Sequence, residues 1–116
     1  MGSGNLFEEG VRSFNSGRYY EAHEIWEDAW RVVDGPLKRF YQGLIQAAVG
    51  LHHLQHGNTV GGQSQLTKSL TTLKASIDED HGIDLADLIR QLTLVRDTMQ
   101  MGSIQIRRRG ASGEQR

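Results

Sequence analysis

Two residues of the chain, His23 and Glu27, have side-chain types and a spacing that suit metal binding. They are four residues apart, so on a helix they lie on the same side, one turn from each other. His53 supplies a third ligand if the helix that carries it packs against the first. Three such ligands with an open coordination position suit a divalent metal ion, zinc, manganese or iron, in hydrolytic or redox chemistry. Glu24 is then a candidate catalytic general base.

The same side chains also fit two functions that involve no metal. One is a buried hydrogen-bond network of His, Glu and Gln side chains that fixes how two helices pack. The other is a polar pocket for a small molecule or a peptide, with Tyr20 beside it. The residues of this predicted pocket are His23, Glu27, Trp30, Gln42, Gln46 and His53. The metalloprotease pattern H-E-x-x-H is not met, because Glu27 stands where the second histidine is needed. This favours the structural network over the metal site.

Helices must position these side chains, and the spacing of apolar residues predicts five. We expect helices over residues 6–15, 19–33 and 36–56, a fourth that begins at Thr59 and a fifth that Asp84 caps. Glycines follow or precede most of these segments, as is typical of helix ends. A strand pattern is absent from the sequence, so the predicted fold is all-α.

The third predicted helix is unusual because the face opposite its apolar stripe carries few charges. A helix of this kind is usually covered on more than one side, and Gly43 and Gly50 would let a neighbouring helix of the same chain or of a second subunit approach closely. The polar line on this face consists of Gln42, Gln46 and His53. Unpaired buried polar groups cost about 1–3 kcal/mol each. We therefore expect the line to face the second helix, where His23 and Glu27 would be its partners.

A short pattern recurs at an offset of forty residues: Phe14 to Tyr20 and Leu54 to Val60 both read apolar, polar, polar, Gly, polar and then a helix. Each unit predicts two antiparallel helices joined by a glycine turn. Two units fall short of the three or more that a solenoid needs. We therefore expect a compact bundle of about five helices, built from two antiparallel helical hairpins plus a C-terminal helix.

The composition limits the remaining possibilities. A chain of 116 residues with a formal charge of −1 is one domain without a strong field for nucleic acid or membrane, and we expect it to bind neither. The lack of cysteine excludes disulfides and thiolate sites.

We assign residues 1–5 to a tag scar or a disordered segment, 6–103 to a single helical domain and 104–116 to a disordered basic tail. No apolar run approaches the roughly 18 residues of a membrane span, so we expect a cytoplasmic protein.

Two stretches of the sequence resemble a known family. The first is Phe14-Asn15-x-Gly17-x-Tyr19-Tyr20-Glu21-Ala22, followed by His23-Glu24-x-x-Glu27-x-x-Trp30-Arg31. The second is Phe40-x-Gln42-Gly43-Leu44-Ile45-Gln46-x-Ala48, followed by His52-His53 and Gly57-Asn58. In this order they resemble the two motifs of the family known as domain of unknown function 309. The resemblance implies a small all-helical protein of bacteria or archaea, and it names no reaction. Gly61-Gly62 departs from the family, where an alanine beside the glycine is expected.

The sequence therefore predicts a non-enzymatic binding or scaffold module with a buried His/Glu/Gln network. Its partner would be a protein, a peptide or a second copy of the chain. The alternative is a metal-dependent hydrolase-like enzyme that uses His23, Glu27 and His53. Enzymatic activity, the ligand and the oligomeric state are left open by the sequence.

Overall fold

The computed structural model describes residues 5–110, which form five α-helices and no strand. The helices are α1 (Leu6–Asn15), α2 (Tyr19–Arg31), α3 (Gly35–Gln55), α4 (Thr59–Lys74) and α5 (Leu85–Thr98). The predicted all-α fold is confirmed, and each predicted boundary lies within two residues of the observed one. As expected, Pro36 lies in the first turn of α3, and the Asp84 carboxylate accepts from the N–H of Asp87, 3.0 Å away, at the start of α5.

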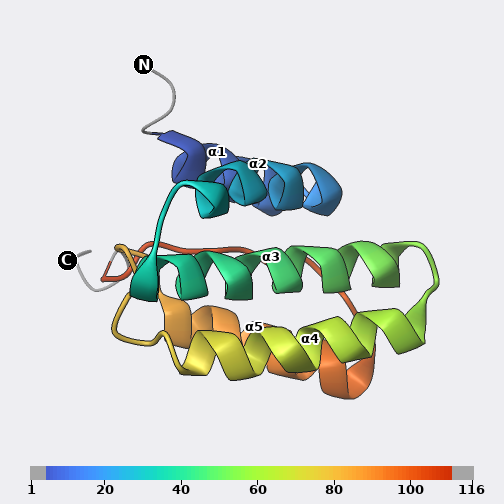
Figure 1. Ribbon diagram of the computed structural model, residues 1–116. Helices are drawn as coiled ribbons and strands as arrows, with labels where there is room; N and C mark the ends of the chain where they lie inside the picture. The colour runs from blue at the N-terminus through green and yellow to red at the C-terminus, as the bar shows by residue number, and fades with distance from the viewer. Residues whose placement is uncertain (1–4, 111–116) are drawn as a thin grey trace.

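The helices pack as two antiparallel hairpins and one further helix, as predicted. In Figure 1 the hairpin of α1 and α2 lies over α3, α4 runs antiparallel beneath α3, and α5 packs against α4. The centre of the molecule is filled by fully buried apolar side chains, among which Trp26, Phe14 and Phe40 are the largest. Among the described residues, no helix is both long enough and apolar enough to cross a membrane.

The two hairpins have matching turns, which confirms the repeat at an offset of forty residues. Gly17 and Gly57 both have φ near +80°, a left-handed conformation that glycine adopts without steric cost. In each turn the N–H that follows the glycine donates to a carbonyl five residues earlier, at 2.9 Å in the first and 2.8 Å in the second. The glycines therefore end one helix and reverse the chain in the same way in both units.

The match continues into the helix contacts. A Cβ atom added to Gly10 of α1 would lie 2.1 Å from the indole nitrogen of Trp26, and one added to Gly50 of α3 would lie 3.0 Å from Leu66. Both glycines let the facing helix approach closely. The approach that the sequence predicted for the uncharged face of α3 is thus observed, and the approaching helix is α4 of the same chain.

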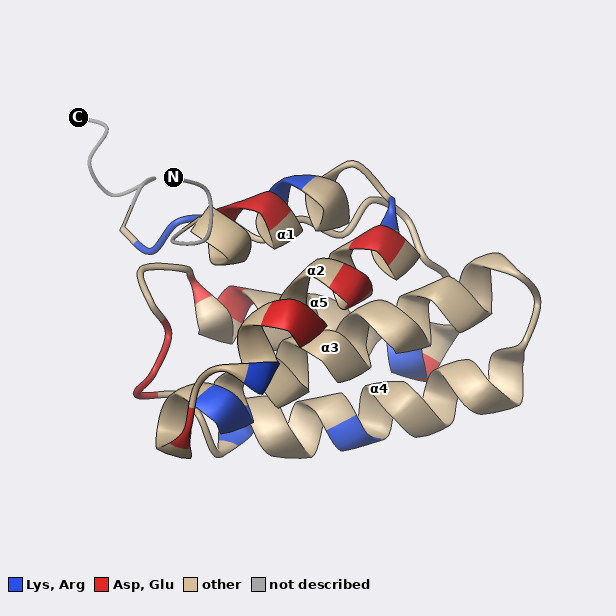
Figure 2. Ribbon diagram, turned by 45° about the horizontal axis from the view of Figure 1, so that its top comes forward, with Lys and Arg blue, Asp and Glu red and all other residues tan. Residues whose placement is uncertain are grey.

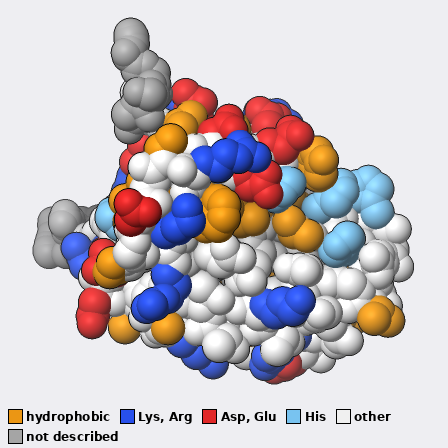
Figure 3. Space-filling view, in the orientation of Figure 1, with side chains coloured by type: hydrophobic (Ala, Val, Ile, Leu, Met, Phe, Trp, Pro, Cys, Tyr) orange, Lys and Arg blue, Asp and Glu red, His pale blue; other side chains and the backbone are white. Residues whose placement is uncertain are grey.

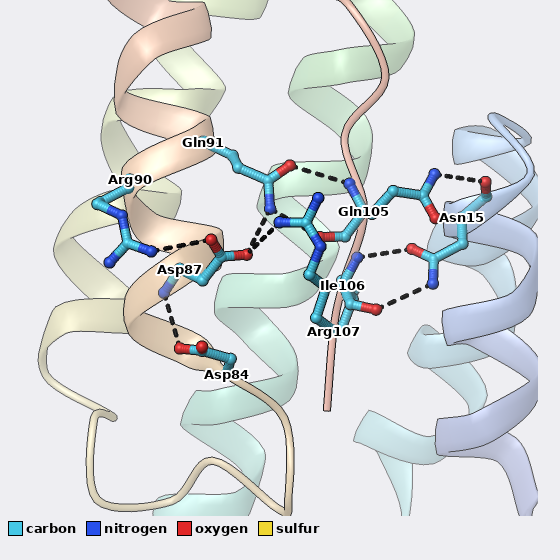
Figure 4. Close-up of polar contacts among 8 residues, drawn as sticks. All are labelled: Asn15, Asp84, Asp87, Arg90, Gln91, Gln105, Ile106 and Arg107. Atoms are coloured by element: carbon cyan, nitrogen blue, oxygen red, sulfur yellow. Dashed lines mark hydrogen bonds and ion pairs between the residues drawn. The ribbon is translucent and has the colours of Figure 1, made fainter. Parts of the chain in front are cut away.

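The C-terminal segment corrects one prediction. Residues 104–110, expected to be part of a disordered tail, cross from α5 back to α1, and Ile104 and Ile106 are each only 5% exposed. The carboxamide of Asn15 pairs with the backbone of Ile106: it donates to the carbonyl at 3.0 Å and accepts from the N–H at 2.7 Å. Gln91 of α5 makes a similar pair of bonds with the backbone of Gln105 (Figure 4).

The arginines of this segment are also paired. Arg107 contacts Asp87 at 3.0 Å, Arg109 contacts Asp80 at 2.6 Å, and Arg108 contacts Glu8. The described part of the segment is therefore a strap that closes over α1 and α5. Residues 1–4 and 111–116, which the sequence also assigned to disordered ends, lie outside the described residues.

Candidate functional site

The predicted pair of His23 and Glu27 is formed on α2. His23 Nε2 lies 3.2 Å from Glu27 Oε2, and the other carboxylate oxygen lies 3.6 Å from Arg31. A carboxylate can only accept, so Nε2 donates the hydrogen. The His23 side chain is 16% exposed, and its other nitrogen, Nδ1, is a buried polar atom without a hydrogen-bond partner among the described residues. Such an atom usually has a partner in a folded protein. Because Nε2 carries the hydrogen, Nδ1 of the neutral ring is an unused acceptor.

Aromatic rings from two helices gather around this histidine. The Tyr20 ring lies 5.2 Å from the His23 ring on α2 and 5.1 Å from the His52 ring on α3, measured between centroids. The His52 ring in turn lies 4.3 Å from the His56 ring and 6.2 Å from the His53 ring. We call Tyr20, His23, His52, His53 and His56 the Tyr–His cluster. Figure 3 shows histidine side chains gathered at one end of the molecule.

The cluster affects the protonation of its central histidine. Partial burial lowers the pKa of His52 below its ordinary value of 6.5, and the neighbouring His56, His53 and His23 lower it further. Both effects disfavour a positive charge on the ring. The folded protein therefore favours the uncharged form of the His52 ring.

The predicted polar line on α3 does not face α2 as a unit. Gln46 Oε1 accepts a hydrogen bond from Thr72 Oγ1 of α4 at 3.0 Å, so Gln46 lies against α4 and the prediction of an α2 partner for it is wrong. Gln42 is half-buried, and no hydrogen bond joins its side chain to another described residue. His53 Nδ1 lies 3.4 Å from the amide nitrogen of Asn58, at the turn into α4. Gln46 and His53 therefore have their partners on α4 and on the turn before it.

Trp30 lies near the opposite end of α2 from Tyr20. The Lys38 ammonium sits 3.9 Å above its ring and also donates to its backbone carbonyl at 3.0 Å, a cation–π contact that closes the turn between α2 and α3. Three residues of the predicted pocket therefore have separate partners: Trp30 contacts Lys38, Gln46 contacts Thr72 and His53 lies beside Asn58. A hollow of about 820 Å³ lies elsewhere, between α4 and α5, and its lining residues are Gln63, Ser64, Thr67, Lys68, Arg96 and Asp97.

The predicted metal ligands His23, Glu27 and His53 are not brought together. Over residues 5–110, no three His, Asp or Glu side chains are grouped so that they could hold a metal ion. Glu24, the candidate general base, is exposed on the outer side of α2. The metal-dependent hydrolase stays a prediction that no contact observed in the structure supports.

The charged residues divide between the two hairpins. Helices α1 and α2 carry six acidic and two basic residues, whereas α3 and α4 carry four basic and no acidic ones. Figure 2 shows acidic residues along α1 and α2, and others on the loop that leads into α5. On α2, Tyr20, Glu24 and Glu27 follow each other at a spacing of four and three, so they share one side of the helix. The Tyr–His cluster therefore borders an acidic strip.

Comparison with known proteins gives a family and two relatives. A family model described as "Domain of unknown function (DUF309)" matches residues 7–64. An uncharacterized protein of Aquifex aeolicus is 32% identical over 99 residues, which cover 84% of this chain and 30% of the relative. The uncharacterized protein YpuF of Bacillus subtilis is 35% identical over 86 residues, covering 71% of this chain and 49% of the relative. The chain thus spans less than half the length of each of these relatives.

Proposed function

The chain belongs to the DUF309 family, and we propose that it is a non-enzymatic binding module that docks a basic segment of a partner protein on its Tyr–His cluster. The observation that carries this proposal is the position of Tyr20. Its side chain is 51% exposed, yet its ring contacts histidines of both α2 and α3. Tyrosine is enriched among the residues that dominate binding energy at protein interfaces, because it offers a large contact area at a low cost in conformational entropy.

The charge beside the cluster supports a basic partner. Glu24 is exposed one turn from Tyr20, and Glu27 follows on the same side of α2. An arginine or lysine of the partner can lie over the Tyr20 ring and pair with these carboxylates at the same time. A segment rich in Asp or Glu would meet repulsion from the same strip.

The unpaired nitrogen of His23 supports the same surface. A buried polar atom without a hydrogen bond costs about 1–3 kcal/mol, and an N–H of a partner that reaches His23 Nδ1 would recover this energy. Tyr20 stands next to His23 and is half exposed, so a partner that contacts the Tyr20 ring also comes close to His23. In the proposed complex Tyr20 moves aside or stacks on the incoming group.

The charge preference is tested with two panels of short peptides matched in length and aromatic content, one rich in Arg and Lys and the other in Asp and Glu. Binding is followed through the backbone amide NMR shifts of the protein. We expect the basic panel to shift the amides around Tyr20, His23 and His52 and the acidic panel to leave them unchanged. Tyr20→Ala and Glu24→Lys should each weaken this binding.

The matched control for these variants is Leu94→Ala. Leu94 is also a large exposed side chain, at 63% exposure, but it lies on α5 away from the cluster. The control variant should bind the basic panel as the unchanged protein does. Equal binding of both panels, or the same loss in Leu94→Ala as in Tyr20→Ala, would argue against the proposal.

A further inference from the structure

We propose that His52 and His56 form a two-ligand site for a divalent transition-metal ion of the zinc, nickel or copper class. This inference goes beyond the proposed binding of a protein segment and does not rest on it. His52 lies on the last turn of α3, and His56, four residues later, is the C-cap residue of that helix; their ring centroids are 4.3 Å apart. Histidines one turn apart on a helix can place one nitrogen each on the same ion.

The orientation of His56 fits a metal ligand. Its Nδ1 lies 3.0 Å from the backbone carbonyl of His52. A carbonyl oxygen can only accept, so Nδ1 carries the hydrogen, and Nε2 keeps its lone pair. A metal-bound histidine typically donates its other ring N–H to a carbonyl or carboxylate, which fixes the tautomer and the ring orientation. His56 already has this arrangement.

The surroundings of His52 fit the second ligand. Its ring is held between Tyr20 on one side and His56 on the other, at 5.1 Å and 4.3 Å. The His52 ring therefore lies directly beside the ring of the other proposed ligand.

The distances allow both rings to reach one ion. Zinc–nitrogen bonds of about 2.0–2.1 Å with tetrahedral angles place the two nitrogens about 3.3 Å apart, a separation compatible with ring centroids 4.3 Å apart. The other histidines of the cluster have different neighbours, because His23 Nε2 lies on Glu27 and His53 Nδ1 lies beside Asn58. The remaining coordination positions are left to water or to a group of another molecule.

The site is tested by isothermal titration of Zn²⁺ alone into the untagged 116-residue chain at neutral pH. We expect one ion per chain, and His52→Ala and His56→Ala should each weaken binding by roughly tenfold or more, because each removes one of two ligands that act together. His53→Ala and the matched control His81→Ala, an exposed histidine in the loop before α5, should bind zinc as the unchanged chain does. Circular dichroism of each variant shows that the helices are retained.

A second readout locates the ion. The ring proton and nitrogen NMR signals of His52 and His56 should shift on zinc addition, while those of His81 stay in place. The proposal is overturned if the unchanged chain binds zinc no more tightly than the variant in which both His52 and His56 are alanine. It is also overturned if His23→Ala or His53→Ala removes binding while His56→Ala does not.

Discussion

The Tyr20 ring on α2 lies 5.1 Å from the His52 ring on α3, so the first hairpin meets the second through an aromatic contact that is open to solvent. The contact joins the two sequence motifs of the family at one end of the molecule. It also places four of the five histidines of the chain around one exposed tyrosine.

Tyr20 should matter more for binding than for stability. Aromatic pairs contribute about 0.5–1.5 kcal/mol beyond their buried area, and half of this side chain is exposed. We expect Tyr20→Ala to lower the free energy of unfolding by about 1 kcal/mol and Tyr20→Phe, which keeps the ring, to lower it by less. Urea denaturation measures both values. A much larger loss in Tyr20→Ala would mean that the residue belongs to the core and not to a binding surface.

His52 should make stability depend on pH. Its pKa is lower in the folded protein than the ordinary value of 6.5 that it regains on unfolding. Between these two values the unfolded chain binds more protons, so folding is less favoured as the pH falls through 6.5 and below. Burial lowers the pKa of His52 most, followed by the neighbouring titratable groups: His56 at the C-cap of α3, His53 on α3 and His23 on α2.

This pH dependence can be measured by urea denaturation at about pH 7.5, 6.5 and 5.5. The stability of the unchanged chain should fall along this series, and His52→Gln should fall less steeply because glutamine does not titrate. His81→Gln serves as the control, since His81 lies outside the cluster. Identical slopes for His52→Gln and the unchanged chain would contradict the assignment.

Asn15 should anchor the C-terminal strap. Replacing it with alanine leaves the N–H and the carbonyl of Ile106 without the partners they now have. We expect Asn15→Ala to lower the free energy of unfolding by about 1–3 kcal/mol and to speed hydrogen exchange at the Ile106 amide. Ser16→Ala, which removes only an exposed hydrogen bond to Arg12, should have little effect. An unchanged exchange rate at Ile106 would show that the strap is held without Asn15.

Gly10 should tolerate a methyl group less well than its counterpart Gly50. The added Cβ would lie 2.1 Å from the Trp26 ring at Gly10 but 3.0 Å from Leu66 at Gly50. Overpacking costs about 1–3 kcal/mol, and the fully buried Trp26 has little room to move. We expect Gly10→Ala to lower the thermal midpoint more than Gly50→Ala does. The reverse order would contradict the packing described here.

The helices were predictable from the sequence because their signals are local. Glycines after α1 and α3, the capping Asp84 and apolar residues every three or four positions are all visible in a short window. The strap was not predictable in this way. Its two buried residues, Ile104 and Ile106, alternate with polar ones, but the stretch is too short for this alternation to predict an ordered segment. Its partner Asn15 lies near the other end of the chain.

In the candidate site, too, the contact within one helix was predictable and the contacts between helices were not. The contact of His23 with Glu27 lies within one helix and follows from their spacing, and it was predicted. The partner of Gln46 depends on how α3 is rotated between α2 and α4, and one residue changes that direction by about 100°. The predicted partner was therefore on the wrong helix. The contact between Tyr20 and His52 depends on the same rotation, and the sequence did not predict it.

The most direct test of the proposed binding surface is site-specific photo-crosslinking. A benzophenone amino acid replaces Tyr20 in one variant and the exposed Leu94 of α5 in another, and both are irradiated in an extract of the cells that make the protein. We expect a discrete protein adduct from position 20 that Glu24→Lys and an excess of the basic peptides both reduce, and no such adduct from position 94. An adduct of twice the chain's mass would identify the partner as a second copy. The same adducts from both positions, or an adduct from position 94 alone, would contradict the assignment of the Tyr–His cluster as the binding surface.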